Sequence, residues 1–268
     1  MMKTIHIRQE KFVLELLDRF HMTNCHPVQT PQVNGAVTTT DLAVDTRNVP
    51  YQNLIGALQY LVSATRPDIA NTVRFLASHN HNHTQTHWRM AKRVLQYLKG
   101  SASLGLTFDG KKNTIPQAFS DADFANDLND SKSISGMVIT LAGAAVLFSS
   151  KKQSMVGHST TEVEFIAAAE AAKSIVWLIE LLHELKYDIK QSIPLHVDNQ
   201  SAIQVARRSS AHDRTKHIRL RFHFIKDLVD EGMIEQRYIN TKEQVADILT
   251  KSIVLAQFER LRFMLGMT

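Results

Sequence analysis

The order of strand-like and helical segments after residue 100 is the feature that most restricts the fold of this 268-residue chain. Strand-like apolar runs with glycines at turn positions come first, and one long helical segment follows from Thr161 to about Tyr187. Strands and helices then alternate to the end. The strand-like segments are SLGLTF, IPQAFSD, SISGMVITLAGAAVLFSS, SIPLHVD and MIEQRYIN, and the later helices begin near Ser201, Lys216 and Thr241. This order predicts an α/β fold with a mixed sheet flanked by helices.

The first 110 residues have a different character and are predicted to be mostly helical. Apolar spacing of helical period covers residues 12–20, returns from Tyr51, and returns again in HWRMAKRVLQYLKG, which stops at Gly100. The second run should pause at Arg66, because a residue before proline is pushed away from helical geometry. Pro67 is then well placed to open the next helix.

Composition limits the class of protein without choosing one. The single cysteine, Cys25, excludes an internal disulfide framework and fits a reducing compartment. No run of about 18 apolar residues suggests a membrane span, and the polar N-terminus does not resemble a secretory signal. The formal net charge of +5 is compatible with nucleic-acid binding but does not demonstrate it.

The stretch AFSDADFAND carries an apolar strand into three aspartates, Asp121, Asp123 and Asp127. One aspartate at a strand end is usually a turn or cap residue. A metal site is the alternative, but it needs carboxylates from several elements, because Mg²⁺ prefers octahedral oxygen ligation. The question is therefore whether other acids converge on Asp121.

Glu164 is the first such acid. Steps of one or two helical turns from Glu164 reach an apolar stripe on the long helix: Ala168, Ala171, Ile175, Leu178 and Leu182. A glutamate at the head of a buried stripe is costly unless something pairs with it. Glu162 and Glu170 fall instead on sides of the helix that we expect to meet solvent.

Two more candidates lie downstream. Asp198 ends the strand in PLHVDNQSAI, where open α/β folds place ligands, although capping of the next helix is an equal alternative. Thr241 and Gln244 match a capping box, so a helix should begin there and hold Asp247 one turn in. Asp247 alone is nonspecific, because most such acids are solvated.

The order strand-Asp, helix-Glu, strand-Asp, helix-Asp resembles that of a known family. Residues 115–253 resemble the ribonuclease H domain of copia-type LTR-retrotransposon Pol proteins, through the motifs SDADFAND, SKSISG, SSKKQ, STTEVEFIAAAEA, VDNQSAI, RTKHI and EQVADILTK. The resemblance implies a ribonuclease H-like mixed five-stranded sheet flanked by helices, preceded by a mostly helical connection region. The family's catalytic, metal-binding carboxylates fall on Asp121, Glu164, Asp198 and Asp247.

The resemblance continues upstream and suggests a division of the chain. Residues 1–50 resemble the reverse-transcriptase tail and linker, residues 51–112 the helical connection region, and residues 113–268 the ribonuclease H-like domain. Neither a Tyr-Val-Asp-Asp-like motif nor any adjacent pair of aspartates occurs, so we expect no polymerase activity.

The implied function is cleavage of the RNA strand of RNA/DNA hybrids. Two Mg²⁺ ions about 3.5–4 Å apart, with Mn²⁺ as a substitute, would offset the repulsion between the carboxylates and run an in-line displacement. The hybrid is the expected partner, the reverse-transcriptase portion is a second candidate, and no membrane is implied. The family's replication particles suggest a cytoplasmic location.

Basic residues cluster near the start of the predicted helix at Lys216. We expect phosphate contacts there, since such charges carry affinity for nucleic acid, although a solvated helix face is the alternative. The expected contact residues are Arg214, Lys216, His217, Arg219 and Arg221. The run HNHNHTQTH raises the possibility of zinc binding, but closely spaced histidines without cysteines are more often incidental.

Two rival functions remain open at this point. One is a catalytically inactive nucleic-acid-binding remnant of a decayed element, which binding without cleavage in Mg²⁺ would favour. The other is an integrase-like or transposase-like enzyme. That class resembles a three-acid pattern with the glutamate last, whereas Glu164 lies between Asp121 and Asp198.

Overall fold

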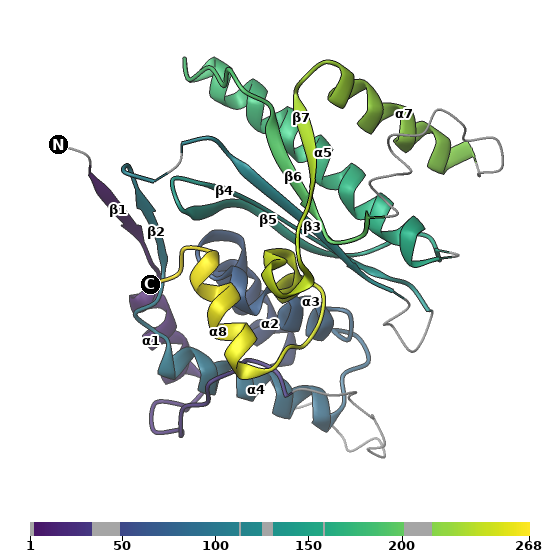
Figure 1. Ribbon diagram of the computed structural model, residues 1–268. Helices are drawn as coiled ribbons and strands as arrows, with labels where there is room; N and C mark the ends of the chain where they lie inside the picture. The colour runs from purple at the N-terminus through teal and green to yellow at the C-terminus, as the bar shows by residue number, and fades with distance from the viewer. Residues whose placement is uncertain (1–2, 34–48, 113, 125–130, 158, 201–215) are drawn as a thin grey trace. The chain divides into compact units, whose positions relative to one another are not determined.

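A computed structural model describes residues 3–33, 49–112, 114–124, 131–157, 159–200 and 216–268 (Figure 1). The chain forms two compact units. We call residues 1–4 with 108–250 the sheet unit, and residues 5–107 with 251–268 the helical unit. The predicted division at residues 50 and 112 stays a prediction, because these units group residues by contact and not by ancestry.

The sheet unit contains a mixed five-stranded sheet. Its strands are β3 (Gln117–Asp123), β4 (Ile134–Leu141), β5 (Ala144–Lys152), β6 (Ile193–Val197) and β7 (Ile234–Tyr238). They lie in the order β5-β4-β3-β6-β7. β3, β4 and β5 pair antiparallel, whereas β6 runs parallel to both β3 and β7. The mixed five-stranded sheet predicted from the sequence is therefore confirmed.

Two helices, α5 (Thr160–Glu184) and α7 (Lys216–Asp230), cover one face of this sheet (Figure 1). α5 begins where the Ser159 side chain accepts a hydrogen bond from the backbone N–H of Glu162. The predicted stripe from Glu164 to Leu182 is buried throughout, and most of it packs with Ala118, Leu195 and Phe222 in one apolar cluster. Small residues near the start of α5 let it lie close on β3.

The segment after β7 differs from its prediction. No α-helix starts at Thr241; two short 3₁₀ helices, η2 (Thr241–Glu243) and η3 (Val245–Leu249), occupy that stretch. The reason lies in the two capping-box residues, whose side chains bind elsewhere. Gln244 is buried and donates its amide to the backbone carbonyl of Ser120 on β3, while Thr241 donates its hydroxyl to Asp198.

The helical unit contains the helices predicted upstream. Its elements are α1 (Glu10–Arg19), α2 (Tyr51–Ala64), the 3₁₀ turn η1 (Pro67–Ile69), α3 (Ala70–Ala77), α4 (Gln85–Gly100) and α8 (Leu255–Met264). Two short strands, β1 (Thr4–Ile7) and β2 (Leu106–Asp109), each have residues in both units. β1 and β2 form a two-stranded sheet. The predicted break at Arg66 is confirmed, since α2 ends at Ala64 and Pro67 opens η1.

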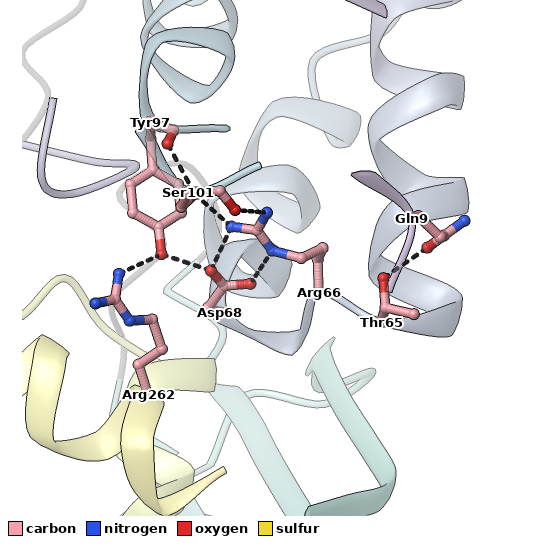
Figure 2. A network of polar contacts seen from close by, with 7 residues as sticks. All are labelled: Gln9, Thr65, Arg66, Asp68, Tyr97, Ser101 and Arg262. Atoms are coloured by element: carbon pink, nitrogen blue, oxygen red, sulfur yellow. Dashed lines mark hydrogen bonds and ion pairs between the residues drawn. The ribbon is translucent and has the colours of Figure 1, made fainter. Parts of the chain in front are cut away.

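A buried polar network holds this unit together (Figure 2). The Arg66 guanidinium pairs with Asp68 through two nitrogens, at 2.8 and 3.0 Å, and also donates to Ser101. Tyr97 donates its hydroxyl to Asp68 at 2.5 Å and accepts from Arg262 of α8 at 3.0 Å. Burial opposes the charge on Arg66, but the Asp68 partner outweighs it and keeps the Arg66 pKa above its ordinary value.

In the part of the chain that the structure describes, no helix has the length and apolar character needed to cross a membrane.

Candidate metal centre

The parallel pair β3 and β6 brings two aspartates to one end of the sheet. Ala118 pairs with Leu195, and Phe119 pairs with His196. When the same register is continued for two more residues, Asp121 lies beside Asp198. Both parallel strands point their carboxyl ends to this edge. The apolar approach of each strand therefore ends in a carboxylate at the same place.

Asp121 points to the sheet face that α5 does not cover. Side chains alternate along β3, and its neighbours Ala118 and Ala122 pack in the clusters that contain α5 residues. Asp121 is only 1% exposed and accepts a hydrogen bond from the hydroxyl of Thr250, which is fully buried just after η3. The hydrogen-bond donor to Asp121, Thr250, therefore lies on the face of the sheet that α5 does not cover.

Gly136 lets η3 approach this face. It is the β4 residue paired with Asp121. A Cβ atom at Gly136 would lie 2.6 Å from Cγ2 of Thr250 and 2.9 Å from the carbonyl oxygen of Ala246. Any larger residue there would push η3 away, so the glycine of the SISG motif is explained by packing.

η3 delivers the third carboxylate. Gln244 anchors the start of η3 to β3 through the Ser120 carbonyl, at 2.9 Å, and also accepts from the Ala246 N–H at 3.2 Å. All five residues of η3 are buried, and Asp247 is 1% exposed. The expectation that an acid here is commonly solvated does not apply to Asp247.

Asp121, Asp198 and Asp247 form one cluster. Each offers a carboxylate oxygen, and the three oxygens lie within 4.8 Å of one another. Asp121 and Asp247 are buried and Asp198 is half-buried. Negative charges this close and this poorly hydrated repel each other strongly unless a cation compensates them. Carboxylate oxygens are the ligands preferred by hard divalent cations, so this cluster suggests a divalent metal site.

Asp198 lies one residue beyond β6 at the more exposed side of the cluster. The Thr241 hydroxyl donates to its Oδ2 atom at 3.0 Å. The helix that Asp198 was alternatively expected to cap falls on residues 201–215, which lie outside the described part of the chain.

Glu164, the fourth predicted ligand, lies on α5 and is not one of the three clustered acids. It is 7% exposed, and its Oε2 atom is shielded from solvent. Because Asp121 points away from α5, the two side chains start from opposite faces of β3. The role of Glu164 in holding a metal stays a prediction.

The other predicted residues are described only in part. Asp123 is half-buried at the end of β3, and Asp127 lies outside the described residues. Among the basic candidates, Arg219 is exposed and Arg221 is half-buried on α7. Arg214 lies outside the described residues, as do the side chains of Lys216 and His217. Their contacts with nucleic acid stay predictions.

The histidine run packs as aromatic rings. His79 stacks on His87 at 4.0 Å and His83 on Tyr51 at 4.2 Å. His87 accepts from the Thr84 N–H through Nδ1 at 2.9 Å and so caps α4. Over the described ranges, the only group of acids, histidines or cysteines with metal-compatible spacing is the aspartate cluster.

Four residues of the site were missed at the level of sequence: Thr250, Thr241, Gln244 and Gly136. Each acts through a contact between distant segments, so no local periodicity marks it. The one available signal was their position in the sequence. Thr241, Gln244 and Thr250 lie within six residues of Asp247, and Gly136 lies in the SKSISG motif.

Comparison with known proteins gives clear relatives. No protein-family model matches the sequence. The chain is 36% identical to the retrovirus-related Pol polyprotein from transposon TNT 1-94 of Nicotiana tabacum, over 99% of this chain and 20% of that protein. It is 34% identical to the corresponding polyprotein from transposon RE2 of Arabidopsis thaliana, over 98% of this chain and 18% of that protein. The chain thus spans about a fifth of the length of the curated relatives it matches.

Among solved structures, the chain is similar to LC11-RNase H1, isolated from compost by a metagenomic approach. The TM-score is 0.40 at 15% identity, over 51% of this chain and 93% of that chain.

Proposed function

We propose that the chain is the ribonuclease H segment of a copia-type Pol polyprotein, because nearly its whole length is similar to retrovirus-related Pol polyproteins of plant transposons. In this proposal it is a metal-dependent endonuclease that cleaves the RNA strand of an RNA/DNA hybrid. The carrying observation is the cluster of Asp121, Asp198 and Asp247, whose oxygens lie within 4.8 Å of one another at the ends of two parallel strands.

The donor set fits divalent cations. Three carboxylates, two of them buried, supply oxygen ligands and a charge that a hard cation neutralises. Asp121 and Asp198 would hold the metal most closely, and Asp247 and Glu164 would complete the ligand set. When bound, two Mg²⁺ ions supply an activated water and stabilise the leaving oxygen of an in-line phosphodiester displacement.

The protein's own part is to hold these carboxylates in fixed positions. Thr250 donates to Asp121, and Thr241 donates to Asp198. Gln244 ties η3, and with it Asp247, to the β3 backbone. Hydrogen bonds from neutral donors orient a carboxylate without cancelling its charge, so the cluster stays both ordered and strongly attractive to cations.

The proposed substrate class rests on the similarity to Pol polyproteins together with basic side chains on α7. Arg219 and Arg221 of α7 belong to the same unit as the acid cluster. Affinity for nucleic acid depends largely on such charges. Selection of a hybrid further requires contacts to the RNA 2′-hydroxyl, which distinguishes RNA from DNA.

The test is cleavage of a labelled RNA/DNA hybrid in Mg²⁺ or Mn²⁺ by the wild-type chain and by Asp198→Asn. We expect the wild-type chain to cut the RNA strand, leave duplex DNA intact and lose activity on chelation. Asp198→Asn keeps the size of the side chain but removes one charge from the cluster, so activity should fall at least about a hundredfold. If both chains bind the hybrid and neither cuts it, the chain is a nucleic-acid-binding remnant and the enzyme proposal is wrong.

A further inference from the structure

The net positive charge of the chain is concentrated in one segment of the helical unit. Residues 69–107 contain five Lys and Arg side chains and no Asp or Glu. Removing these five from the chain's 31 Lys and Arg residues leaves 26, which equals its 26 Asp and Glu residues. The formal charge of +5 therefore belongs to this segment, which lies wholly in the helical unit.

α4 carries four of these five cations: Arg89, Lys92, Arg93 and Lys99. Arg89, Lys92 and Lys99 follow one another at intervals of three and seven residues, so they form a row along one side of the helix. The opposite side of α4 buries Val94 and Leu98. At 1.5 Å per residue, this row is about 15 Å long.

Two of the cations are held in place by neutral partners. Lys99 donates to the backbone carbonyl of Thr23 at 2.5 Å, and Arg93 donates to the Thr30 hydroxyl at 3.1 Å. A carbonyl or a hydroxyl orders a cation but does not cancel its charge. The contacts that fix these two side chains therefore leave the positive field of α4 intact.

An aromatic ring accompanies the row. The Lys92 ammonium lies 5.9 Å from the centre of the Trp88 ring, and Trp88 packs near Phe20 at 6.4 Å. Arg89 is exposed, and Lys92 and Trp88 are half-buried. Like charges this close repel one another, and a polyanion lying along the row would relieve the repulsion. We call Arg89, Lys92, Lys99 and Trp88 the basic face of α4.

We propose that the basic face of α4 binds the phosphate backbone of a nucleic-acid duplex, independently of the acid cluster. A duplex strand presents one phosphate about every 3.4 Å along its axis, so a row about 15 Å long can follow four or five phosphates. A segment without a single acid suits a continuous polyanion better than a protein surface of mixed charge. The choice of nucleic acid over another polyanion rests on the proposed function.

The experiment measures binding of an RNA/DNA hybrid to the full chain at several salt concentrations, in an Asp198→Asn background that suppresses cleavage. Arg89→Gln and Lys92→Gln each remove one charge. Each should reduce the slope of log K against log salt by about 0.9, which weakens binding about eightfold at 0.1 M salt. Lys92→Arg should behave as the parent chain does.

Lys11→Gln is the matched control, because Lys11 is exposed on α1 of the same unit, in a helix that also carries three acids. Its salt slope should not change. A footprint gives a second readout that does not depend on the variants. Saturating hybrid should protect Lys92 from acetylation and leave Lys11 reactive, as measured by mass spectrometry of peptides.

Unchanged salt slopes in Arg89→Gln and Lys92→Gln, or full acetylation of Lys92 in saturating hybrid, would overturn the proposal. Vesicles of phosphatidylcholine and phosphatidylserine test the other large polyanion. Vesicle binding that is lost in these variants, with hybrid slopes unchanged, would assign the face to a membrane surface instead. A chain that cuts the hybrid with unchanged slopes would keep the nuclease and lose only this face. Reduced slopes in a chain that never cuts would support the face and reject the nuclease.

Discussion

Thr250 supplies a hydrogen-bond donor to the buried side chain of Asp121, and a polar group withdrawn from water is costly unless it has such a partner. The hydroxyl also lies 3.2 Å from the backbone carbonyl of Asp247. One side chain thus contacts both buried acids of the cluster. Its methyl group fills the space left by Gly136, so both ends of the threonine are used.

We predict that Thr250→Val weakens divalent-metal binding. Valine keeps the shape but removes the donor, and a hydrogen bond to a charged group contributes about 1.5–3 kcal/mol, which is roughly ten- to a hundredfold in affinity. Calorimetric titration with Mg²⁺ or Mn²⁺ measures the effect directly. Thr250→Ser keeps the hydroxyl and should bind nearly as the wild type does. Equal affinity in Thr250→Val would show that the hydroxyl does not position Asp121.

His87 gives the helical unit a dependence on pH. Burial, followed by the charges of His79 and His83, lowers the His87 pKa from 6.5 to about 4. Between those values the unfolded chain binds a proton that the folded chain does not, so the free energy of unfolding falls as pH falls through this window. Protonation would also convert Nδ1 from the acceptor that caps α4 into a donor.

We therefore expect the wild type to lose more stability than His87→Gln when the pH drops from 7 to 4.5, as measured by urea unfolding. Glutamine also accepts from an N–H but does not titrate. His223→Gln serves as control, because His223 is exposed on α7. The same loss of stability in wild type and His87→Gln would mean that other groups control the acid transition.

At the scale of elements, the periodicity of the sequence predicted those structural features that depend on a single segment of the chain. The buried stripe of α5 and the break at Arg66 could be predicted because each follows from neighbouring residues. η3 could not, since its conformation depends on Gln244 reaching the backbone of Ser120, more than a hundred residues earlier. The same limit applies to the site: the aspartates could be chosen at strand ends, whereas the groups that orient them come from other elements.

Gly136→Ala should disturb η3 without touching a carboxylate. The added Cβ would sit 2.6 Å from Thr250 and 2.9 Å from the Ala246 carbonyl, and overpacking of this kind costs about 1–3 kcal/mol. We expect a lower unfolding midpoint and weaker metal binding together. Gly56→Ala is the control, because nothing lies within 4 Å of a Cβ there and alanine favours the α2 helix by about 0.5–1 kcal/mol. Unaltered metal affinity in Gly136→Ala would show that η3 tolerates the displacement.

At the scale of the whole molecule, the chain leaves the helical unit after residue 107 and returns to it at residue 251. α8 follows the sheet unit in sequence, yet its Arg262 donates to Tyr97 and its Phe258 packs edge-on against the same ring at 5.6 Å. Sequence order could not predict this, because nothing local in residues 251–268 identifies distant helices as their partners. Stability of the helical unit should therefore depend on residues at the far end of the chain.

Leu261→Ala tests this dependence. Leu261 is fully buried on α8, and truncation of such a leucine costs about 2–5 kcal/mol. Hydrogen exchange resolved to peptides should accelerate in α2 and α4 while β3 and β4 keep their protection. Ile225→Ala on α7, equally buried in the sheet unit, should produce the opposite pattern. If hydrogen exchange accelerated equally in both units for either variant, the chain would unfold as one cooperative body. α8 would then stabilise the sheet unit as much as the helices that it contacts.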